Sequence, residues 1–391
     1  MLFFDLELLL IMKGNCVQTL VDKGAEKILS GLLAKTGVEV SSSELADIIV
    51  RDRSFCREVL LTGSMGLGDS YIKGKWDSDN LDEVIYKIVK SGLHQLLAPI
   101  YDFVGIQRRK MRNLQDKEGS KKVMDEHYDL PVEIYEAFLD PYFQYTCARF
   151  EGTDNLDEAQ KIKMENICDK LDLKEGDRVL DIGGGWGGLA KYMSETRNIN
   201  VTVVTLSKEQ AEYIRKQHDG NTEVVESDYR DIPDALNEKF DAISVVGMME
   251  HVGSKNYEEF MNVLHDKLKT GGKLLIHTLY TPYSEPMQNP WLDKHIFPNG
   301  ELAPKEVIED EMSKYFVPNN ESDYPIFEEL TPNYPPTLIS WRNNLKEARQ
   351  RGEITMDDKE FRKWEFYFMS FAGMMRANHV RVGQFSYKKA A

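Results

Sequence analysis

The sequence feature that most constrains the fold is a glycine-rich stretch at residues 178–188, RVLDIGGGWGG. Its first half contains Val179, Leu180 and Ile182 and is typical of a buried strand, and the glycines that follow predict a tight turn. A helix is expected to begin near Gly187. A strand, a glycine turn and a helix N-terminus together predict a crevice that binds a nucleotide-like cofactor.

The neighbouring sequence narrows the kind of cofactor. A dinucleotide site needs an acidic residue about 20 positions after the turn, where it holds the ribose. Here the strand expected at 201–205 ends in Thr205-Leu206-Ser207, without a carboxylate. The acidic residue instead precedes the first glycine, as Asp181. This arrangement resembles the first motif of class I S-adenosylmethionine (SAM) methyltransferases.

The rest of the second half alternates between strand and helix patterns. Strands are expected at 201–205, 223–226, 240–246 and 273–279, with helices at 156–171, 207–218 and 256–269. This alternation predicts an α/β fold with a parallel sheet and helices on both faces. Residues 282–350 are expected to be a partly helical insertion over the carboxyl ends of the strands. A long helix near 358–377 and a strand at 380–387 complete the chain.

The first 110 residues predict a small, mostly α-helical domain. Residues 17–35 and 80–90 have helical periodicity, the serine run near 41 predicts a capped helix start within 41–52, and glycines at 63–68 predict a turn-rich break. The expected organisation is therefore a helical domain at 1–110, a linker at 111–126 and a catalytic domain at 127–391.

Composition excludes several classes of protein. The net charge of −16 argues against general nucleic-acid binding, which needs a basic face. The four cysteines show neither metal-ligand spacing nor a dense disulfide pattern, so no metal and a reducing, cytoplasmic location are expected. The apolar N-terminus carries Asp5 and Glu7 and does not resemble a secretory signal. Residues 1–11 are expected to be an upstream start or a loosely ordered arm.

A basic stretch at 107–122 allows two interpretations. It is either a solvated tether or a patch that contacts anionic lipid head groups, where each basic side chain is worth about 1 kcal/mol. Its basic residues are Arg108, Arg109, Lys110, Arg112, Lys117, Lys121 and Lys122.

Residues 64–391 resemble the cyclopropane-fatty-acyl-phospholipid synthases, which use SAM to methylenate cis double bonds of acyl chains in membrane phospholipids. The matching segments include HYDLPVEIYEAFLDPYFQYTCARFEG, VLDIGGGWGGLAKYM, TLSKEQ, SDYRD, VGMMEHVGSKNY, LLIHTL and KHIFPNGELAP. The resemblance implies a phospholipid substrate, a peripheral location at the inner face of the membrane, a lipid-capture role for the N-terminal domain and a homodimer.

The resemblance also implies which residues bind SAM. They are Tyr145, Thr146, Asp181, Gly183, Gly185, Gly187, Thr205, Leu206, Gln210, Asp228 and Tyr229. Each has a structural alternative, because Tyr145 and Tyr229 could be core aromatics and Asp228 a turn or cap residue. Their order within an α/β pattern favours the binding interpretation.

Ring closure on an alkene needs a base that removes a proton from the new methyl group, and water must be excluded. The family binds bicarbonate as that base. The resemblance assigns its ligands to Glu250, His277 and Tyr334, with the backbones of Cys147 and Leu279. The alternatives are a strand-end ion pair for Glu250 and a satisfied core histidine for His277.

Two positions depart from the family pattern. Gly184 replaces a cysteine in the glycine turn, and Phe371 replaces a cysteine once considered a nucleophile, so a covalent cysteine mechanism is not expected. Three other functions remain: addition of a plain methyl group to an alkene or an amine, a silent lipid- or SAM-binding module, and a dehydrogenase. The bicarbonate set favours ring closure, because amine methylation needs no second deprotonation.

Overall fold

The computed structural model describes residues 15–96, 113–119, 131–217, 220–320 and 323–390. They form two compact units. The first contains the described residues up to 111, together with Asn289–Ile296 and Met356–Ala377, and the second contains the remainder. The sequence predicted that both of these later segments belong to the catalytic domain, and the contacts of the structure group them with the N-terminal helices instead.

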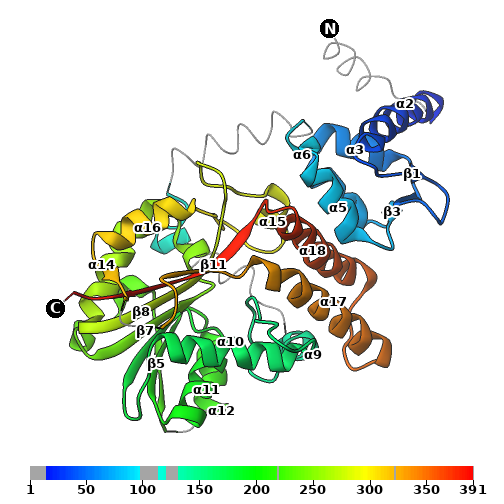
Figure 1. The fold of residues 1–391 in the computed structure, drawn as a ribbon. Helices are drawn as coiled ribbons and strands as arrows, with labels where there is room; N and C mark the ends of the chain where they lie inside the picture. The colour runs from blue at the N-terminus through cyan, green and yellow to red at the C-terminus, as the bar shows by residue number, and fades with distance from the viewer. Residues whose placement is uncertain (1–14, 97–112, 120–130, 218–219, 321–322, 391) are drawn as a thin grey trace. The chain divides into compact units, whose positions relative to one another are not determined.

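The second unit is built on a mixed sheet with the strand order β10-β11-β8-β7-β4-β5-β6, and β9 pairs with β11 (Figure 1). Strands β4 to β8 are mutually parallel, whereas β11 runs antiparallel between β8 and β10. The strands are β4 (Arg178–Ile182), β5 (Asn200–Thr205), β6 (Thr222–Glu226), β7 (Phe240–Val246), β8 (Leu268–Tyr280), β9 (Val317–Pro318), β10 (Phe327–Glu329) and β11 (Arg381–Lys388).

Helices cover both faces of this sheet. One hydrophobic core joins the strands to α10 (Leu156–Lys170), α11 (Gly188–Arg197) and α12 (Lys208–Gln217). The other joins them to α13 (Met249–Val252), α14 (Tyr257–Lys267) and α16 (Lys305–Ser313). Strand order reverses at β4, whose neighbours are β5 and β7, and open α/β sheets bind ligands at such a switch point. The predicted fold class and the predicted strands are confirmed.

The first unit is mostly helical, with a small sheet in the order β1-β2-β3. Its elements are α2 (Asn15–Ala34), β1 (Val40–Ser41), β2 (Ile48–Val50), α3 (Ser54–Thr62), α4 (Ser64–Ile72), β3 (Trp76–Asp77), α5 (Leu81–Lys90), α6 (Leu93–Leu96), α15 (Pro290–His295) and α18 (Asp358–Arg376). Helix α18 packs closely on α5. At Gly373 the two helices approach so closely that an added Cβ would lie 2.5 Å from the Asp82 carbonyl oxygen.

For this unit, one prediction is wrong and another is confirmed only in part. The segment 41–52 does not begin a helix: Ile48–Val50 form β2, and all three side chains are buried. Branching at Cβ favours a strand where both faces are covered. The glycines at 63–68 break the helix only at Gly63, which has φ +55° and separates α3 from α4, whereas Gly66 and Gly68 lie inside α4. Gly66 and Gly68 serve close packing: an added Cβ would lie 2.2 Å from the Glu58 carbonyl oxygen or from Trp291 Nε1.

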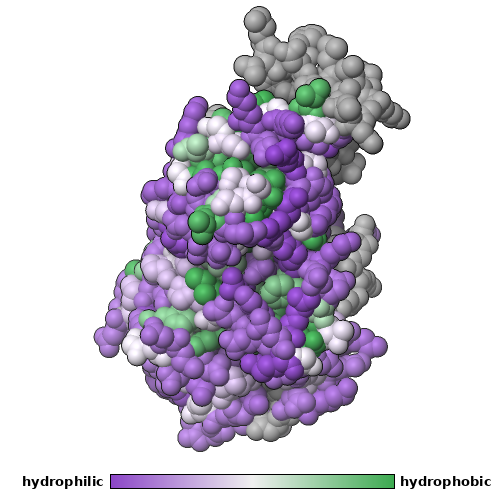
Figure 2. Space-filling model, turned by 90° about the vertical axis from the view of Figure 1, so that its right-hand side faces the viewer, coloured by the Kyte–Doolittle hydropathy of each residue, from purple (hydrophilic) through white to green (hydrophobic). Residues whose placement is uncertain are grey.

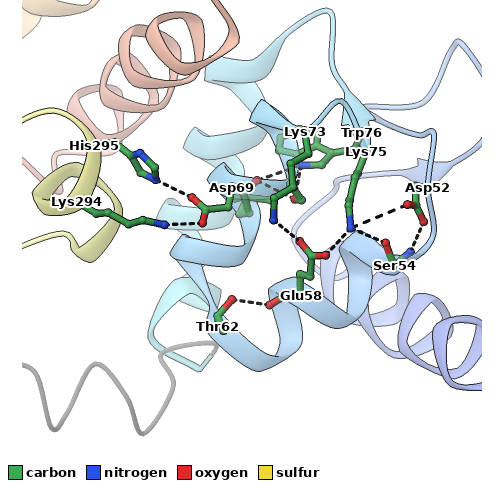
Figure 3. A network of polar contacts seen from close by, with 12 residues as sticks. Asp52, Ser54, Glu58, Thr62, Asp69, Lys73, Lys75, Trp76, Lys294 and His295 are labelled. Atoms are coloured by element: carbon green, nitrogen blue, oxygen red, sulfur yellow. Dashed lines mark hydrogen bonds and ion pairs between the residues drawn. The ribbon is translucent and has the colours of Figure 1, made fainter. Parts of the chain in front are cut away.

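A polar network completes the packing of the first unit (Figure 3). Asp69 on α4 accepts from Lys294 Nζ at 2.9 Å and pairs with His295 Nε2 at 2.7 Å, which fastens α15 to α4. Glu58 accepts from Lys75 Nζ at 2.5 Å. Partial burial acts to raise the pKa of Asp69, but the hydrogen bonds from His295 and Lys294 outweigh it and lower that pKa to about 2.

Hydrophilic side chains dominate the face shown in Figure 2, and hydrophobic residues form small patches among them. Within the described ranges, no helix combines the length and the hydropathy of a membrane span. The N-terminal arm and most of the basic stretch at 107–122 lie outside the described residues.

Candidate functional site

A pocket of about 220 Å³ opens in the second unit where β4 ends. Its walls come from the glycine turn, from the ends of β5, β6 and β7, and from the loops at 114–119, 143–146 and 298–299. All residues predicted to bind SAM line this pocket except Gly187, which precedes α11. The structure therefore brings together side chains that the sequence spreads over residues 145–229.

Asp181 lies at the base of the pocket and is 1% exposed. Its Oδ1 accepts from Ser244 Oγ on β7 at 2.7 Å, and its Oδ2 has no hydrogen-bond partner among the described residues. Burial raises the pKa of this carboxyl to about 6, while the Ser244 hydrogen bond and Lys163 act in the opposite direction. A buried carboxylate with a free oxygen is suited to accept from a polar ligand.

The glycine turn leaves room for this carboxylate. A Cβ at Gly184 would lie 2.6 Å from Asp181 Oδ2, so any side chain at this position would require a shift of one of the two residues. Gly183 has φ +73°, a left-handed conformation that favours glycine, and a Cβ there would lie 2.9 Å from Met248. The turn thus fixes the backbone at the mouth of the pocket.

Two strand ends form the opposite wall. Thr205 Oγ1 donates to Gln210 Oε1 at 2.8 Å, which fixes the end of β5 on α12. Asp228 accepts from both the backbone and the guanidinium of Arg230, and that guanidinium lies 4.3 Å from the centre of the Tyr229 ring. Tyr229 also belongs to the hydrophobic core, so the core-aromatic alternative and the pocket interpretation both apply to it.

Tyr145 and Thr146 belong to a third wall, and a buried lysine supports Thr146 from outside the pocket. Tyr145 packs against Tyr135, Phe138 and Trp341, with ring centres 5.2–5.9 Å apart. Thr146 Oγ1 accepts from Lys163 Nζ at 2.8 Å. Lys163 is 1% exposed, and burial lowers its pKa to about 8 although Asp140 and Asp181 oppose that shift.

Glu250 lies on α13 and is buried beside β8. Its Oε1 accepts from the Leu279 amide at 2.6 Å, and its Oε2 has no partner in the described part of the chain. Burial raises the pKa of this carboxyl, and the Leu279 hydrogen bond reduces the shift. The next residue, His251, lines the pocket, and burial lowers the pKa of its ring to about 4. The Leu279 amide is engaged by Glu250 rather than left for a ligand.

His277 lies on β8, two residues before Leu279, and is 2% exposed. Its Nδ1 is 3.2 Å from Gln384 Nε2 on β11. Burial, together with the charges of Lys163 and Lys170, lowers its pKa to about 3, so the ring is neutral. The His277 carbonyl accepts from the amide of Gly247, which lines the pocket, at 2.8 Å.

Tyr334 and Cys147 lie on either side of the turn at 330–333, which is fastened to β11. Tyr334 begins α17 (Tyr334–Arg351), and the turn before that helix is fastened to β11 because Val382 N donates to Thr331 Oγ1 at 2.9 Å. Val382 pairs with Leu279 across the sheet. Cys147 Sγ lies 3.9 Å from the Leu330 carbonyl oxygen, and burial raises the pKa of its thiol, as expected for an unreactive cysteine.

The predicted base residues do not line the cofactor pocket. Three of them adjoin residues that do: Glu250 precedes His251, Cys147 follows Thr146, and the His277 carbonyl accepts from the Gly247 amide. Phe371 is buried on α18 in the first unit and is not among the lining residues. Sequence reasoning missed several wall residues, namely Leu114, Gln115, Gly119, Gln144, Trp186, Met248, His251, Pro298 and Asn299.

Some of these could have been found. Trp186 lies inside the glycine motif itself, and His251 follows Glu250. The segment 114–119 falls in the stretch expected to be a solvated tether or a lipid-contacting patch, yet Gln115 Nε2 donates to the Asn299 carbonyl at 2.7 Å, and Arg230 Nη2 donates to the Gln115 carbonyl at 2.8 Å. Nothing in a polar linker pattern predicts such contacts.

A parallel sheet with this strand order, a glycine turn after its central strand and a buried aspartate beneath that turn define a class I SAM-dependent methyltransferase. Comparison with known proteins narrows the class. Residues 115–385 match the family model described as mycolic acid cyclopropane synthetase. The cyclopropane-fatty-acyl-phospholipid synthase of Escherichia coli K12 is 36% identical over 377 residues, covering 95% of this chain and 96% of that protein. The chain belongs to this family of cyclopropane synthases.

Solved structures agree with this assignment. The cyclopropane synthase MmaA2 from Mycobacterium tuberculosis superposes with a TM-score of 0.62 at 27% identity, over 69% of this chain and 98% of that chain. The mycolic acid cyclopropane synthase CmaA1, solved as a complex with SAH and CTAB, gives a TM-score of 0.61 at 27% identity with the same coverage.

Proposed function

We propose that this enzyme transfers the SAM methyl group as a methylene bridge onto the cis double bond of an unsaturated acyl chain in a membrane phospholipid. Bound bicarbonate would serve as the base. Membership in the cyclopropane synthase family supports SAM-dependent cyclopropanation of lipids. The observation that carries the finer proposal is the free, buried Oε2 of Glu250, the residue before His251 in the pocket wall.

The pocket fits SAM in its polar groups and in its backbone. Asp181 Oδ2, Ser227 Oγ and the Tyr229 hydroxyl are buried without partners among the described residues, and all three residues line the pocket. A Cβ at Gly183 would lie too close to Met248, and a Cβ at Gly184 would lie too close to the Asp181 carboxylate. Asp181, Thr205, Gln210 and Asp228 would hold the cofactor, with Tyr145 and Tyr229 against it. When bound, SAM supplies an electrophilic methyl group.

The predicted base residues fit a small oxyanion that also carries an O–H group. The Glu250 carboxylate can accept that O–H, and neutral His277 and the Tyr334 hydroxyl can each donate to an anionic oxygen. Because both Glu250 and His277 are buried, these hydrogen bonds would form without competition from water. The Leu279 amide would act through Glu250, and Cys147 would contribute its backbone rather than its thiol.

The aromatic wall has two tasks in this chemistry. The rings around Tyr145 exclude water, which would otherwise quench a positively charged carbon as an alcohol. Aromatic faces also stabilise positive charge within about 6 Å. The residues of this chain thus provide a dry site and a proton acceptor held in a fixed position.

The lipid-capture role of the first unit, a peripheral location at the inner face of the membrane and a homodimer belong to the same proposal. In the first unit, Leu20, Ile28 and Leu45 are 69%, 49% and 95% exposed. Such side chains are suited to enter the interface of a bilayer. Phospholipid acyl chains at that surface would be the substrate, and no nucleic acid is expected.

Mass spectrometry of acyl chains would test the function. Purified protein would be incubated with SAM and vesicles of cis-unsaturated phospholipid, with and without bicarbonate. We expect a product heavier by one CH₂ that resists hydrogenation, and we expect less of it without bicarbonate or in Glu250→Ala. A saturated methyl-branched or exomethylene product would exclude ring closure. Absence of any lipid product, with SAM still bound, would direct the search to amine substrates.

A further inference from the structure

A row of buried polar side chains leads from β10 through α10 and β11 to His277. Glu328 accepts from Lys170 Nζ at 2.5 Å, and the same Nζ donates to Gln384 Oε1 at 2.6 Å. Gln384 Nε2 lies 3.2 Å from His277 Nδ1. Lys170 and Gln384 are each 1% exposed, and His277 is 2% exposed, so these groups have little access to water.

The order of donors and acceptors along this row permits a single arrangement. An ammonium group can only donate, so Lys170 requires the oxygen of the Gln384 amide to face it. The amide nitrogen then faces His277, and an NH₂ group can also only donate. His277 Nδ1 must therefore accept with its lone pair, and in a neutral ring the proton lies on Nε2.

We propose that Gln384 is a positioning residue that holds His277 as the Nε2–H tautomer, so that the ring presents a donor to an anionic oxygen. The identity of the anion that this N–H group would bind rests on the proposed function. The tautomer itself is a property of this chain and can be measured without substrate.

The charges around His277 make the choice of tautomer important. Lys163 and Lys170 on α10 disfavour a positive ring, Glu328 on β10 lies beyond Lys170, and Glu250 adjoins β8 at Leu279. Burial and the two lysines hold the ring neutral. A neutral imidazole has one N–H, so the hydrogen bond at Nδ1 decides whether Nε2 is a donor or an acceptor.

Strand pairing within the sheet, rather than a loop, sets the contact between Gln384 and His277. Gln384 and His277 are direct partners across the antiparallel pair of β8 and β11. Side chains of such partners lie on the same face of the sheet with their Cβ atoms about 5 Å apart. Lys170 reaches the pair from α10, on the helix that also carries Lys163.

The first test measures the tautomer directly. The full chain, labelled with ¹⁵N-histidine, would be studied by long-range ¹H–¹⁵N correlation, and His277→Asn would identify the signal among the eight histidines. We expect a protonated Nε2 and a bare Nδ1 in the wild type. In Gln384→Glu, a carboxylate faces Nδ1 and only accepts, so the proton should move to Nδ1 or a second proton should be gained. A wild-type ring protonated on Nδ1, or an unchanged signal in Gln384→Glu, would overturn the proposal.

The second test uses the pH profile of lipid methylenation. Gln384→Glu should lose about 10²-fold at pH 8, the usual cost of removing one donor to a developing or bound anion. As the pH falls, its ring gains a second proton and Nε2–H returns, so the ratio of variant to wild-type activity should rise. Gln384→Met removes the contact without adding charge and should lose activity without that recovery. Equal, pH-independent losses in both variants would reduce Gln384 to a packing residue.

These outcomes separate the tautomer from the function. If the wild type shows Nε2–H but His277→Asn forms product at the wild-type rate, the anion site is wrong and the positioning of the ring stands. If His277→Asn abolishes product but the wild-type proton lies on Nδ1, the positioning role fails and the site stands.

Discussion

The two units treat their partly buried charges in opposite ways. In the first unit, Asp69 faces both Lys294 and His295, and Arg376 pairs with Asp82 and Glu83 at 2.5 and 2.6 Å. In the second unit, one oxygen of Asp181 and one of Glu250 are buried with no partner within the described ranges. The pKa of Asp69 is lowered, whereas the pKa values of Asp181 and Glu250 are raised.

This difference distinguishes structural from functional polar groups. A carboxylate that faces cations stabilises the folded state, because folding improves the environment of its charge. A buried carboxylate with a free oxygen opposes folding and persists only where the surrounding structure holds it. The first unit therefore uses its charges for packing, and the second keeps two of them available for ligands.

The largest effect should follow from Glu250→Gln, which tests this distinction among the predicted base residues. Glutamine keeps an oxygen for the Leu279 amide but replaces the free carboxylate oxygen with a donor. We expect kcat for lipid methylenation to fall about 10²–10⁴-fold, the usual contribution of a positioned proton-transfer group. Because the charged form opposes folding, the melting temperature should stay the same or rise.

Glu347→Gln is the matched control, because Glu347 is 63% exposed in a surface pair with Arg351. Its rate should equal that of the wild type. A clear fall in the melting temperature of Glu250→Gln would instead class Glu250 with the structural carboxylates of the first unit.

The next largest effect concerns Asp181→Asn. Loss of one charge-assisted hydrogen bond costs about 1.5–3 kcal/mol, so the affinity for SAM should fall about 10–100-fold in titration calorimetry. Since burial raises the Asp181 pKa to about 6, wild-type affinity should also weaken as the pH falls through that value, and the variant should not show this change. Asp172→Asn, in an exposed pair with Lys273, is the control. Equal affinities of Asp181→Asn and wild type would remove Asp181 from the site.

The fold could be predicted where local pattern and tertiary packing agree. The run Arg178–Ile182 has apolar residues at 179, 180 and 182 and precedes glycines, and it forms strand β4 as predicted. The prediction failed at β2, where a serine run suggested a helix start, and it held only in part at 63–68, where one of three glycines separates two helices. Periodicity also predicted helix α18, but it could not show that Gly373 packs against α5 rather than within the catalytic domain.

The residues of the candidate site differ in the same way: some could be predicted from a local motif, and others depend on tertiary packing. Asp181 and the glycines of the turn are adjacent in sequence, so a motif identifies them. Gln384 contacts His277 only through the register of β8 and β11, and Lys170 contacts Gln384 only because one face of α10 is turned toward that pair. No spacing in a single sequence records such contacts. Resemblance to the family supplied Glu250 and His277, but it did not supply the groups that orient them.

A smaller effect is expected from Gly68→Ala, which tests packing in the first unit. The new Cβ would lie 2.2 Å from Trp291 Nε1, and overpacking of this kind costs about 1–3 kcal/mol. Gly31→Ala is the opposite case: no atom lies within 4 Å of its Cβ, and alanine in a helix is favoured by about 1 kcal/mol. Hydrogen exchange of α4 and α2 amides would report both changes. Equal effects of the two substitutions would mean that α4 does not pack as described.

The smallest effect is expected from Asp69→Asn, which removes the ion pairs to α15. Partly exposed pairs contribute about 0.2–1 kcal/mol, so protection of α4 and α15 amides from exchange should fall only slightly at pH 7. The folded pKa is lowered from 3.8 to about 2, so the contribution of Asp69 is complete above the first value and is lost as the pH falls toward the second. Wild type and variant should therefore converge in acid. A difference that persisted below pH 2 would show that Asp69 stabilises α15 by packing rather than by charge, and the contrast with Asp181 would then rest on the second unit alone.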